Sequence, residues 1–119
     1  MKKLILIFII FLSLPVFSQI GYIKIENRTA RIFNQNNIYS GYYINLCSSC
    51  QLDYNSKFII ITENKTTRIF NEKGNYTGYY INLCSDCYVE RVLENNILIK
   101  QSNTVRYYNF KGNYTGKYH

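Results

Sequence analysis

The chain is 119 residues long and carries 14 Lys and Arg residues against 7 Asp and Glu residues, a formal net charge of +7. This length gives room for a single domain. The only histidine is His119, which argues against Ser-His-Asp and Cys-His catalytic arrangements, so we expect no enzymatic activity.

The first 18 residues are typical of an export signal. Lys2 and Lys3 give a positive start, residues 4–12 are an unbroken apolar run, and residues 16–18 resemble a signal-peptidase site. We therefore predict cleavage before Gln19 and a periplasmic or extracellular destination. The apolar run is too short to span a bilayer comfortably, which argues against a membrane anchor. After signal removal we expect no transmembrane span.

The remaining residues, 19–119, are predicted to form one β domain. Removal of two lysines leaves 12 basic and 7 acidic residues, a net charge of +5. No segment after the signal has an amphipathic helical pattern, whereas many segments show the period-two alternation of half-buried strands. We expect these strands to pair as antiparallel β-hairpins. They are predicted at residues 22–26, 29–33, 42–46, 51–54, 58–62, 66–70, 79–83, 88–94, 97–101 and 104–108.

Three copies of one sequence motif organise this domain. Thr66–Cys87 is identical to Thr29–Cys50 at 15 of 22 positions, and Thr104–His119 is a truncated third copy. A fixed period of 37 or 38 residues, as between Arg31, Arg68 and Arg106, predicts a repeat architecture. The domain would hold about 2.7 units of this period. We place the units at residues 20–54, 55–94 and 95–119, with four short strands in each complete unit.

Glycines recur at equivalent positions of the copies. An Asn followed three residues later by Gly74 or Gly112 fits a type I turn, and Asn37 takes the glycine position in the first copy. A second glycine of each copy stands next to a pair of strand residues, where it is expected to mark a bulge or a close backbone approach. These second glycines are Gly41 and Gly78, and Gly116 is the equivalent turn glycine of the truncated copy.

The segments R-I-F-N-E-K-G-N-Y-T-G (68–78) and R-Y-Y-N-F-K-G-N-Y-T-G (106–116) resemble the units of the β-flower families. These are small exported bacterial proteins whose hairpins repeat roughly as R-I-Y-D-x-x-G-x-Y-x-G. The resemblance covers three segments of about eleven residues. This chain departs from the pattern by its longer unit, its added C-x-x-C, and Asn34, Asn71 and Asn109 in place of Asp. The resemblance implies an all-β, ring-like hairpin assembly and brings no established activity. A β-trefoil-like closure and propeller-like blades are the alternatives.

Four cysteines form two C-x-x-C motifs, Cys47 to Cys50 and Cys84 to Cys87. An even number of cysteines in an exported protein predicts disulfides, and three pairings are possible. If the intervening residues are hairpin turns, each motif can close on itself, so we favour Cys47–Cys50 with Cys84–Cys87. A metal site built from all four cysteines and thiol redox chemistry are weaker alternatives. The 33 residues between the motifs exceed the usual zinc spacing, and no helix is predicted to activate a thiol.

Two pairs of adjacent tyrosines, Tyr42-Tyr43 and Tyr79-Tyr80, are the last feature of the sequence. Adjacent strand residues face opposite sides, so one tyrosine of each pair should be buried and the other exposed. Exposed tyrosines beside arginines can bind a glycan or polyanion by stacking and charged hydrogen bonds. Cross-strand aromatic packing with solvated arginines is the alternative. The residues concerned are Tyr42, Tyr43, Tyr79 and Tyr80, with Arg31, Arg68 and Arg106.

The sequence therefore predicts an exported, non-enzymatic binding module without a cofactor. Its expected partner is an envelope or surface component, either a glycan, an anionic polymer or a protein. Nucleic acid is not expected, because an export signal precedes the domain. A structural module that assembles into homo-oligomers through strand edges or symmetry is the alternative, and a metal or thiol site is weaker still.

Overall fold

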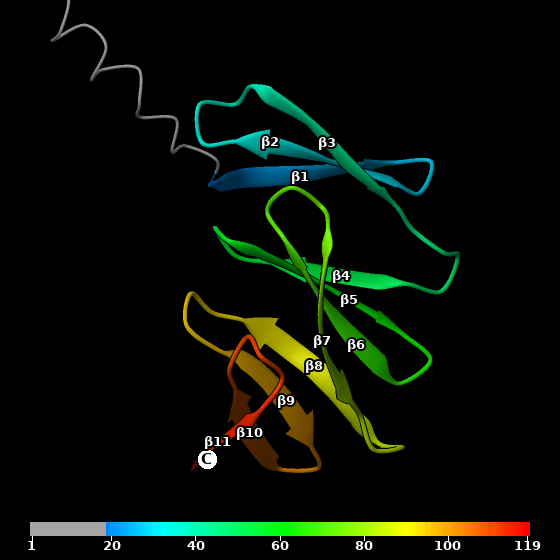
Figure 1. Ribbon diagram of the computed structural model, residues 1–119. Helices are drawn as coiled ribbons and strands as arrows, with labels where there is room; N and C mark the ends of the chain where they lie inside the picture. The colour runs from blue at the N-terminus through cyan, green and yellow to red at the C-terminus, as the bar shows by residue number, and fades with distance from the viewer. Residues whose placement is uncertain (1–18) are drawn as a thin grey trace, which may run out of the picture.

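The computed structural model describes residues 19–119, and the predicted export signal lies outside the described residues (Figure 1). Within this part all regular structure is β, as the sequence predicts, and no helix there is long and apolar enough to cross a membrane. The strands are β1 (Ile20–Glu26), β2 (Thr29–Asn34), β3 (Tyr39–Asn45), β4 (Gln51–Tyr54), β5 (Phe58–Glu63), β6 (Thr66–Asn71), β7 (Tyr76–Asn82), β8 (Cys87–Val92), β9 (Ile97–Gln101), β10 (Thr104–Tyr108) and β11 (Tyr114–Tyr118).

The strands form three small antiparallel sheets that lie one above another in Figure 1. Sheet 1 is β1-β2-β3, sheet 2 is β4-β5-β6-β7 and sheet 3 has the order β11-β10-β9-β8. All pairings are between strands that are consecutive in the chain, so the prediction of antiparallel hairpin repeats is confirmed. The sheets are open, and the ring-like closure implied by the β-flower resemblance stays a prediction.

The sheets are out of phase with the repeats of the sequence. The strand that closes a sequence copy, β4 or β8, pairs with the first strand of the next copy, β5 or β9. Each C-x-x-C motif therefore connects two sheets and does not cap a hairpin, which corrects the expected position of these cysteines.

Two apolar clusters hold the sheets together. Between sheets 1 and 2, Ile20 and Ile32 pack with Ile59 and Ile61. Between sheets 2 and 3, the second cluster is formed by Ile60, Ile69, Ile81, Cys87, Ile97 and Ile99. Sheet 2 is thus covered on both faces, which explains the unbroken apolar run of β5, because its alternate residues face opposite clusters. Burial of one such isoleucine side chain stabilises the fold by about 1.5–3 kcal/mol.

A glycine bulge interrupts the outer hairpin of every sheet. Gly41, Gly78 and Gly116 have φ of +93°, +95° and +95°, and the register of their sheets shifts beside them. A Cβ added at any of the three would meet no atom within 4 Å, so these glycines mark bulges and not close approaches. The bulges let β3 and β7 begin three residues earlier than predicted.

A hydroxyl group stabilises each bulge. The side chain of Thr77 donates to the Ile69 carbonyl at 2.6 Å and accepts from the Tyr79 N–H at 3.2 Å. Ser40 and Thr115 make the equivalent pairs of hydrogen bonds in the other sheets. The Ser or Thr that precedes each of these glycines thus satisfies backbone groups that the register shift would leave unpaired.

The close approaches lie instead at the turn glycines. In sheet 3, the Oδ1 of Asn109 accepts two backbone N–H groups at 2.9 and 3.0 Å, and Gly112 takes φ of +82°. A Cβ on Gly112 would stand 2.5 Å from the carbonyl oxygen of Tyr80 in β7. In sheet 2, a Cβ on Gly74 would stand 3.2 Å from a side-chain carbon of Ile44 in β3. Each of these turns therefore rests on the edge strand of the preceding sheet.

Candidate functional site

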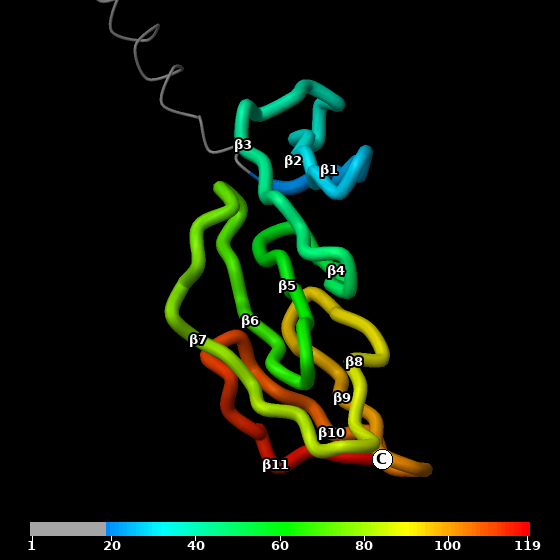
Figure 2. Tube along the Cα trace, turned by 90° about the vertical axis from the view of Figure 1, so that its right-hand side faces the viewer, coloured from blue at the N-terminus to red at the C-terminus, as the bar shows by residue number. Residues whose placement is uncertain are grey.

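The edge strands β3, β7 and β11 lie along the same flank of the stack (Figure 2). Each carries exposed tyrosines, with exposed fractions from 41% for Tyr39 and Tyr42 to 66% for Tyr118. We call this surface the tyrosine flank. It consists of Tyr39, Tyr42, Tyr43, Tyr76, Tyr79, Tyr80, Tyr114 and Tyr118.

The adjacent tyrosines do not divide into one buried and one exposed residue, and that prediction is wrong. Tyr42 and Tyr43 are both exposed, as are Tyr79 and Tyr80. Neighbouring strand residues do point to opposite faces. However, β3 and β7 are the outermost strands of their sheets, and both faces are open to solvent at the tyrosine positions, whereas Ile81 further along β7 is buried. The flank consequently offers more aromatic surface than the sequence predicts.

Every arginine of the repeat stands opposite a tyrosine of this flank. Arg31 pairs across the strands with Tyr43, and Arg68 pairs with Tyr80 in the same way. Sheet 3 repeats the arrangement with Arg106 opposite Tyr118. Residues directly opposite on antiparallel strands share a face and have Cβ atoms about 5 Å apart. In sheets 1 and 2 the structure therefore brings together an arginine and a tyrosine that the sequence singles out, whereas the Tyr118 of sheet 3 was not predicted. Tyr42 and Tyr79 are not opposite an arginine.

All three arginines are half-buried, and Arg31 and Arg106 are partly engaged by neighbours. The Nη1 of Arg31 lies 3.5 Å from a Glu26 carboxylate oxygen, and Arg106 donates to the Gln101 side chain at 3.3 Å. Such contacts hold a guanidinium in place while leaving some of its five N–H donors free for a ligand.

A second aromatic row anchors the flank. The rings of Phe33 and Tyr39 have centroids 5.5 Å apart, and those of Phe70 and Tyr76 are 5.4 Å apart. Sheet 3 repeats the contact with Tyr108 and Tyr114 at 5.7 Å. Sequence reasoning missed the outer tyrosine of these pairs, because it placed this residue in a turn. The 37–38-residue recurrence of the tyrosine was the signal that could have found it.

The cysteines form the disulfides Cys47–Cys50 and Cys84–Cys87, which is the pairing that the sequence favours. Two disulfides indicate that the chain matures in a non-reducing environment. The four sulfur atoms fall into separate groups, one beside Glu63 and one beside Asp86, and do not meet in a single four-cysteine cluster.

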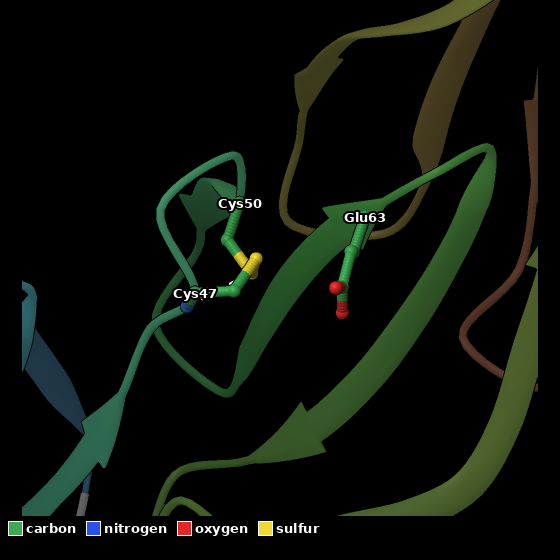
Figure 3. A group of neighbouring side chains, drawn as sticks. All are labelled: Cys47, Cys50 and Glu63. Atoms are coloured by element: carbon green, nitrogen blue, oxygen red, sulfur yellow. Dashed lines mark hydrogen bonds between the residues drawn. A yellow bond between two sulfur atoms is a disulfide. The ribbon is translucent and has the colours of Figure 1, made fainter.

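The Glu63 side chain extends from the end of β5 toward the first disulfide, as Figure 3 shows. Around the second disulfide, Gln101 occupies the position equivalent to Glu63, and its amide donates to the Asp86 carboxylate at 3.1 Å. A carboxylate thus accompanies both disulfides, although it comes from a different segment each time. Asp86 lies between its two cysteines in the sequence, whereas sequence reasoning did not place Glu63 near a disulfide, because that approach depends on the β4–β5 pairing.

No protein-family model matches the chain, and no curated protein matches its sequence. Among solved structures, a protein of unknown function from Bacteroides caccae superposes with a TM-score of 0.49 at 16% sequence identity. The alignment covers 82% of this chain and 37% of that chain, so this chain spans little more than a third of its length. The β-flower resemblance stays a prediction.

Two carboxyl groups away from the flank have shifted pKa values. Burial raises the pKa of Asp53, which stands beside Ile60 on the face of sheet 2 that packs on sheet 3. Hydrogen bonds from the Ser56 hydroxyl and backbone N–H lower the pKa of Glu94. Both groups lie near the contact of sheets 2 and 3, where Asp53 is half-buried and the exposed Glu94 binds Ser56. The tyrosine flank, which combines exposed aromatic rings with guanidinium groups, is the candidate site.

Proposed function

We propose that this protein is an exported, non-enzymatic β-repeat module that binds an extended anionic glycan of the cell envelope along the tyrosine flank. The observation that carries the proposal is the threefold repetition of an exposed tyrosine opposite an arginine, on edges that face the same way.

The chemistry of the flank suits such a ligand. A tyrosine ring presents a rigid apolar face with a polar tip, and the apolar face of a sugar can stack on it. A guanidinium binds carboxylate or phosphate groups with two parallel hydrogen bonds. The excess of basic residues adds a long-range attraction to polyanions.

The repetition favours a linear polymer over a small molecule. Packed sheets are spaced by about 10 Å, so equivalent positions on the three sheets recur at roughly that interval. A polymer that spans several sheets gains affinity from linked contacts, because the second contact is intramolecular. A fragment that reaches only one sheet gains none of this.

Export is supported by the two disulfides and by the signal-like first 18 residues. An oxidising compartment is where such bonds persist, and it is also where envelope polymers are found.

Isothermal titration calorimetry with a size-fractionated acidic polysaccharide tests the proposal. Tyr43→Ala combined with Tyr80→Ala should weaken binding about 30-fold if each ring contributes about 1 kcal/mol. Tyr88→Ala is the matched control, because Tyr88 has an exposed fraction of 48%, close to the 51% of Tyr80, and lies on the opposite edge strand β8.

Binding should also weaken as salt screens the arginines, and it should strengthen with polymer length. Equal loss of affinity in Tyr88→Ala and in the double variant would place the ligand elsewhere. Failure of every acidic polymer to bind the wild-type protein would remove the proposed function.

A further inference from the structure

The two contacts between sheets are copies of one interface. In the first, Ile23 and Ile32 of sheet 1 pack on Ile59 and Ile61 of sheet 2. In the second, Ile60 and Ile69 of sheet 2 occupy the equivalent positions, 37 residues further on, and pack on Ile97 and Ile99 of sheet 3. Every sheet therefore has two different faces. One is of the kind that packs on a preceding sheet, and the other is of the kind that packs on a following sheet.

The stack leaves one face of each kind without a partner sheet in the described residues. The outer face of sheet 3 is equivalent to the face of sheet 2 that packs on sheet 3, with a shift of 38 residues. Across its four strands runs a row of opposed residues, and a second row lies beside it. The first row is Tyr88, Lys100, Val105 and His119, and the second is Arg91, Leu98 and Tyr107.

Three substitutions on this outer face introduce a larger polar or charged side chain, although Val105 at the position of Thr67 runs the other way. Lys100 stands at the position of Thr62, Tyr107 at that of Ile69, and His119 at that of Ile81. In sheet 2 the Thr62 hydroxyl is 2.8 Å from that of Thr67, so the interface there contains no charge at this position. A further sheet placed on sheet 3 would have to bury the Lys100 ammonium group together with the Glu90 carboxylate, whose nearer oxygen lies 3.9 Å from it. Removing so long an ion pair from water is costly.

The long side chains of this face already cover the apolar residues beneath them. Leu98 is 1% exposed and Val105 is 5% exposed, although no described sheet packs on them. Arg91 and Tyr107 flank Leu98 on the neighbouring strands, and the Lys117 ammonium lies 4.5 Å from the centre of the Tyr107 ring. Amphipathic side chains can bury their stems on apolar surface while their polar ends stay in water.

The opposite end of the stack shows the same kind of change. On the outer face of sheet 1, Tyr22 and Lys24 replace the equivalent Ile59 and Ile61 of sheet 2. The Tyr22 ring stacks on Phe33 at 4.6 Å, with the planes 8° apart. Glu26 lies 3.6 Å from the Lys24 ammonium and 3.5 Å from the Arg31 guanidinium.

We propose that these two end faces are caps that prevent a second copy of this chain from continuing the stack. Both faces carry an excess of positive charge. Arg91, Lys100 and Lys117 outnumber Glu90 on sheet 3, and Lys24 and Arg31 outnumber Glu26 on sheet 1. Head-to-tail contact would therefore bring like charges together in a dry interface.

Restoring the internal residues tests the caps. One variant combines Lys100→Thr, Tyr107→Ile and His119→Ile, and a second combines Tyr22→Ile and Lys24→Ile. With both sets present, five outer-face residues become those of the internal interface, while Arg91 and Lys117 remain, and a head-to-tail contact of this kind can continue from copy to copy. We expect sedimentation velocity to show an average mass that about doubles or more with rising concentration, whereas the wild-type protein stays monomeric.

The control, Lys73→Thr with Lys111→Thr, removes an equal number of lysine charges, but from turns, and it should remain monomeric. If this control assembles as well, net charge and not the end faces governs assembly, and the proposal fails. It also fails if the combined variant stays monomeric with a native circular dichroism spectrum. The smaller pair Lys100→Thr with Lys24→Ile carries the same test should the five substitutions disturb folding.

Discussion

Gly78 and Gly112 have similar backbone conformations but different surroundings. Both have positive φ, at +95° and +82°, so both avoid the strain that a Cβ causes there. Gly78 faces open space, whereas Gly112 is pressed against the Tyr80 carbonyl of the preceding sheet. The first glycine serves the shape of its own strand, and the second also permits the contact between sheets.

Alanine substitution should separate these two roles. Gly78→Ala is expected to cost about 1–2 kcal/mol of the free energy of unfolding, from the positive φ alone. Gly112→Ala should cost roughly 2–5 kcal/mol, because its Cβ also displaces a backbone oxygen that cannot swing aside. Urea denaturation measures both values. Equal losses would mean that the turn of sheet 3 moves away from β7 without cost.

Several residue roles were predictable because turn chemistry is local. The positive φ of Gly74, Gly112 and Asn37 follows from the Asn-x-x-Gly pattern, and the structure shows all three. The exposure of both tyrosines in each pair was not predictable. Alternation along a strand assigns faces, but it does not say whether the strand is covered on either face.

Asn55 connects elements that local sequence does not join. It follows β4, is buried, and its amide nitrogen donates to the carbonyl oxygens of Leu93 and Glu94 at 2.9 and 3.2 Å. Its Oδ1 accepts from the N–H groups of Lys57 and Phe58 at 2.8 and 2.7 Å. The side chain thus closes the β4–β5 turn and ties it to the equivalent turn of sheet 3.

Asn55→Asp should destabilise the protein by about 2–3 kcal/mol, because a buried carboxylate would face two partly buried carbonyl oxygens that have lost their donor. Asn71→Asp is the control, since Oδ1 of Asn71 only accepts hydrogen bonds from Lys73 and Asn75 N–H groups. That variant should be close to wild type in its denaturation midpoint. A similar loss in both would assign the effect to added charge and not to the missing donors.

The position of the sheet boundaries could not be derived from the repeat. A period specifies which residues are equivalent, but the point at which one unit ends and the next begins is arbitrary. Pairing of β4 with β5 depends on long-range packing, in which Leu52 joins the cluster between sheets 1 and 2. The cysteine pairing was predictable nonetheless, because three residues of separation suffice to close each disulfide in either arrangement.

At the scale of the whole molecule, each disulfide cross-links the connection between two successive sheets. Cys84 is exposed, whereas Cys87 is 8% exposed and belongs to the cluster between sheets 2 and 3. This second staple is therefore part of the core as well as a cross-link.

Two variants with swapped residues distinguish the two roles. Cys84→Ser with Cys87→Ala and Cys84→Ala with Cys87→Ser both remove the disulfide, at a cost of about 2 kcal/mol for so short a loop. The variant with serine at residue 87 should lose about 1–2 kcal/mol more, since it buries a hydroxyl among isoleucines. Thermal unfolding followed by circular dichroism measures the difference. Identical melting temperatures would show that residue 87 is not held in the core.

The offset between copies and sheets has a consequence for how such a chain can change in length. The segment that leaves one copy is already the first strand of the following sheet. If unequal recombination adds or removes one whole period, every strand therefore still has a strand to pair with, wherever the crossover falls. Gain of half a period would add two strands and leave the packed faces of successive sheets unmatched, so growth of this architecture is confined to whole steps.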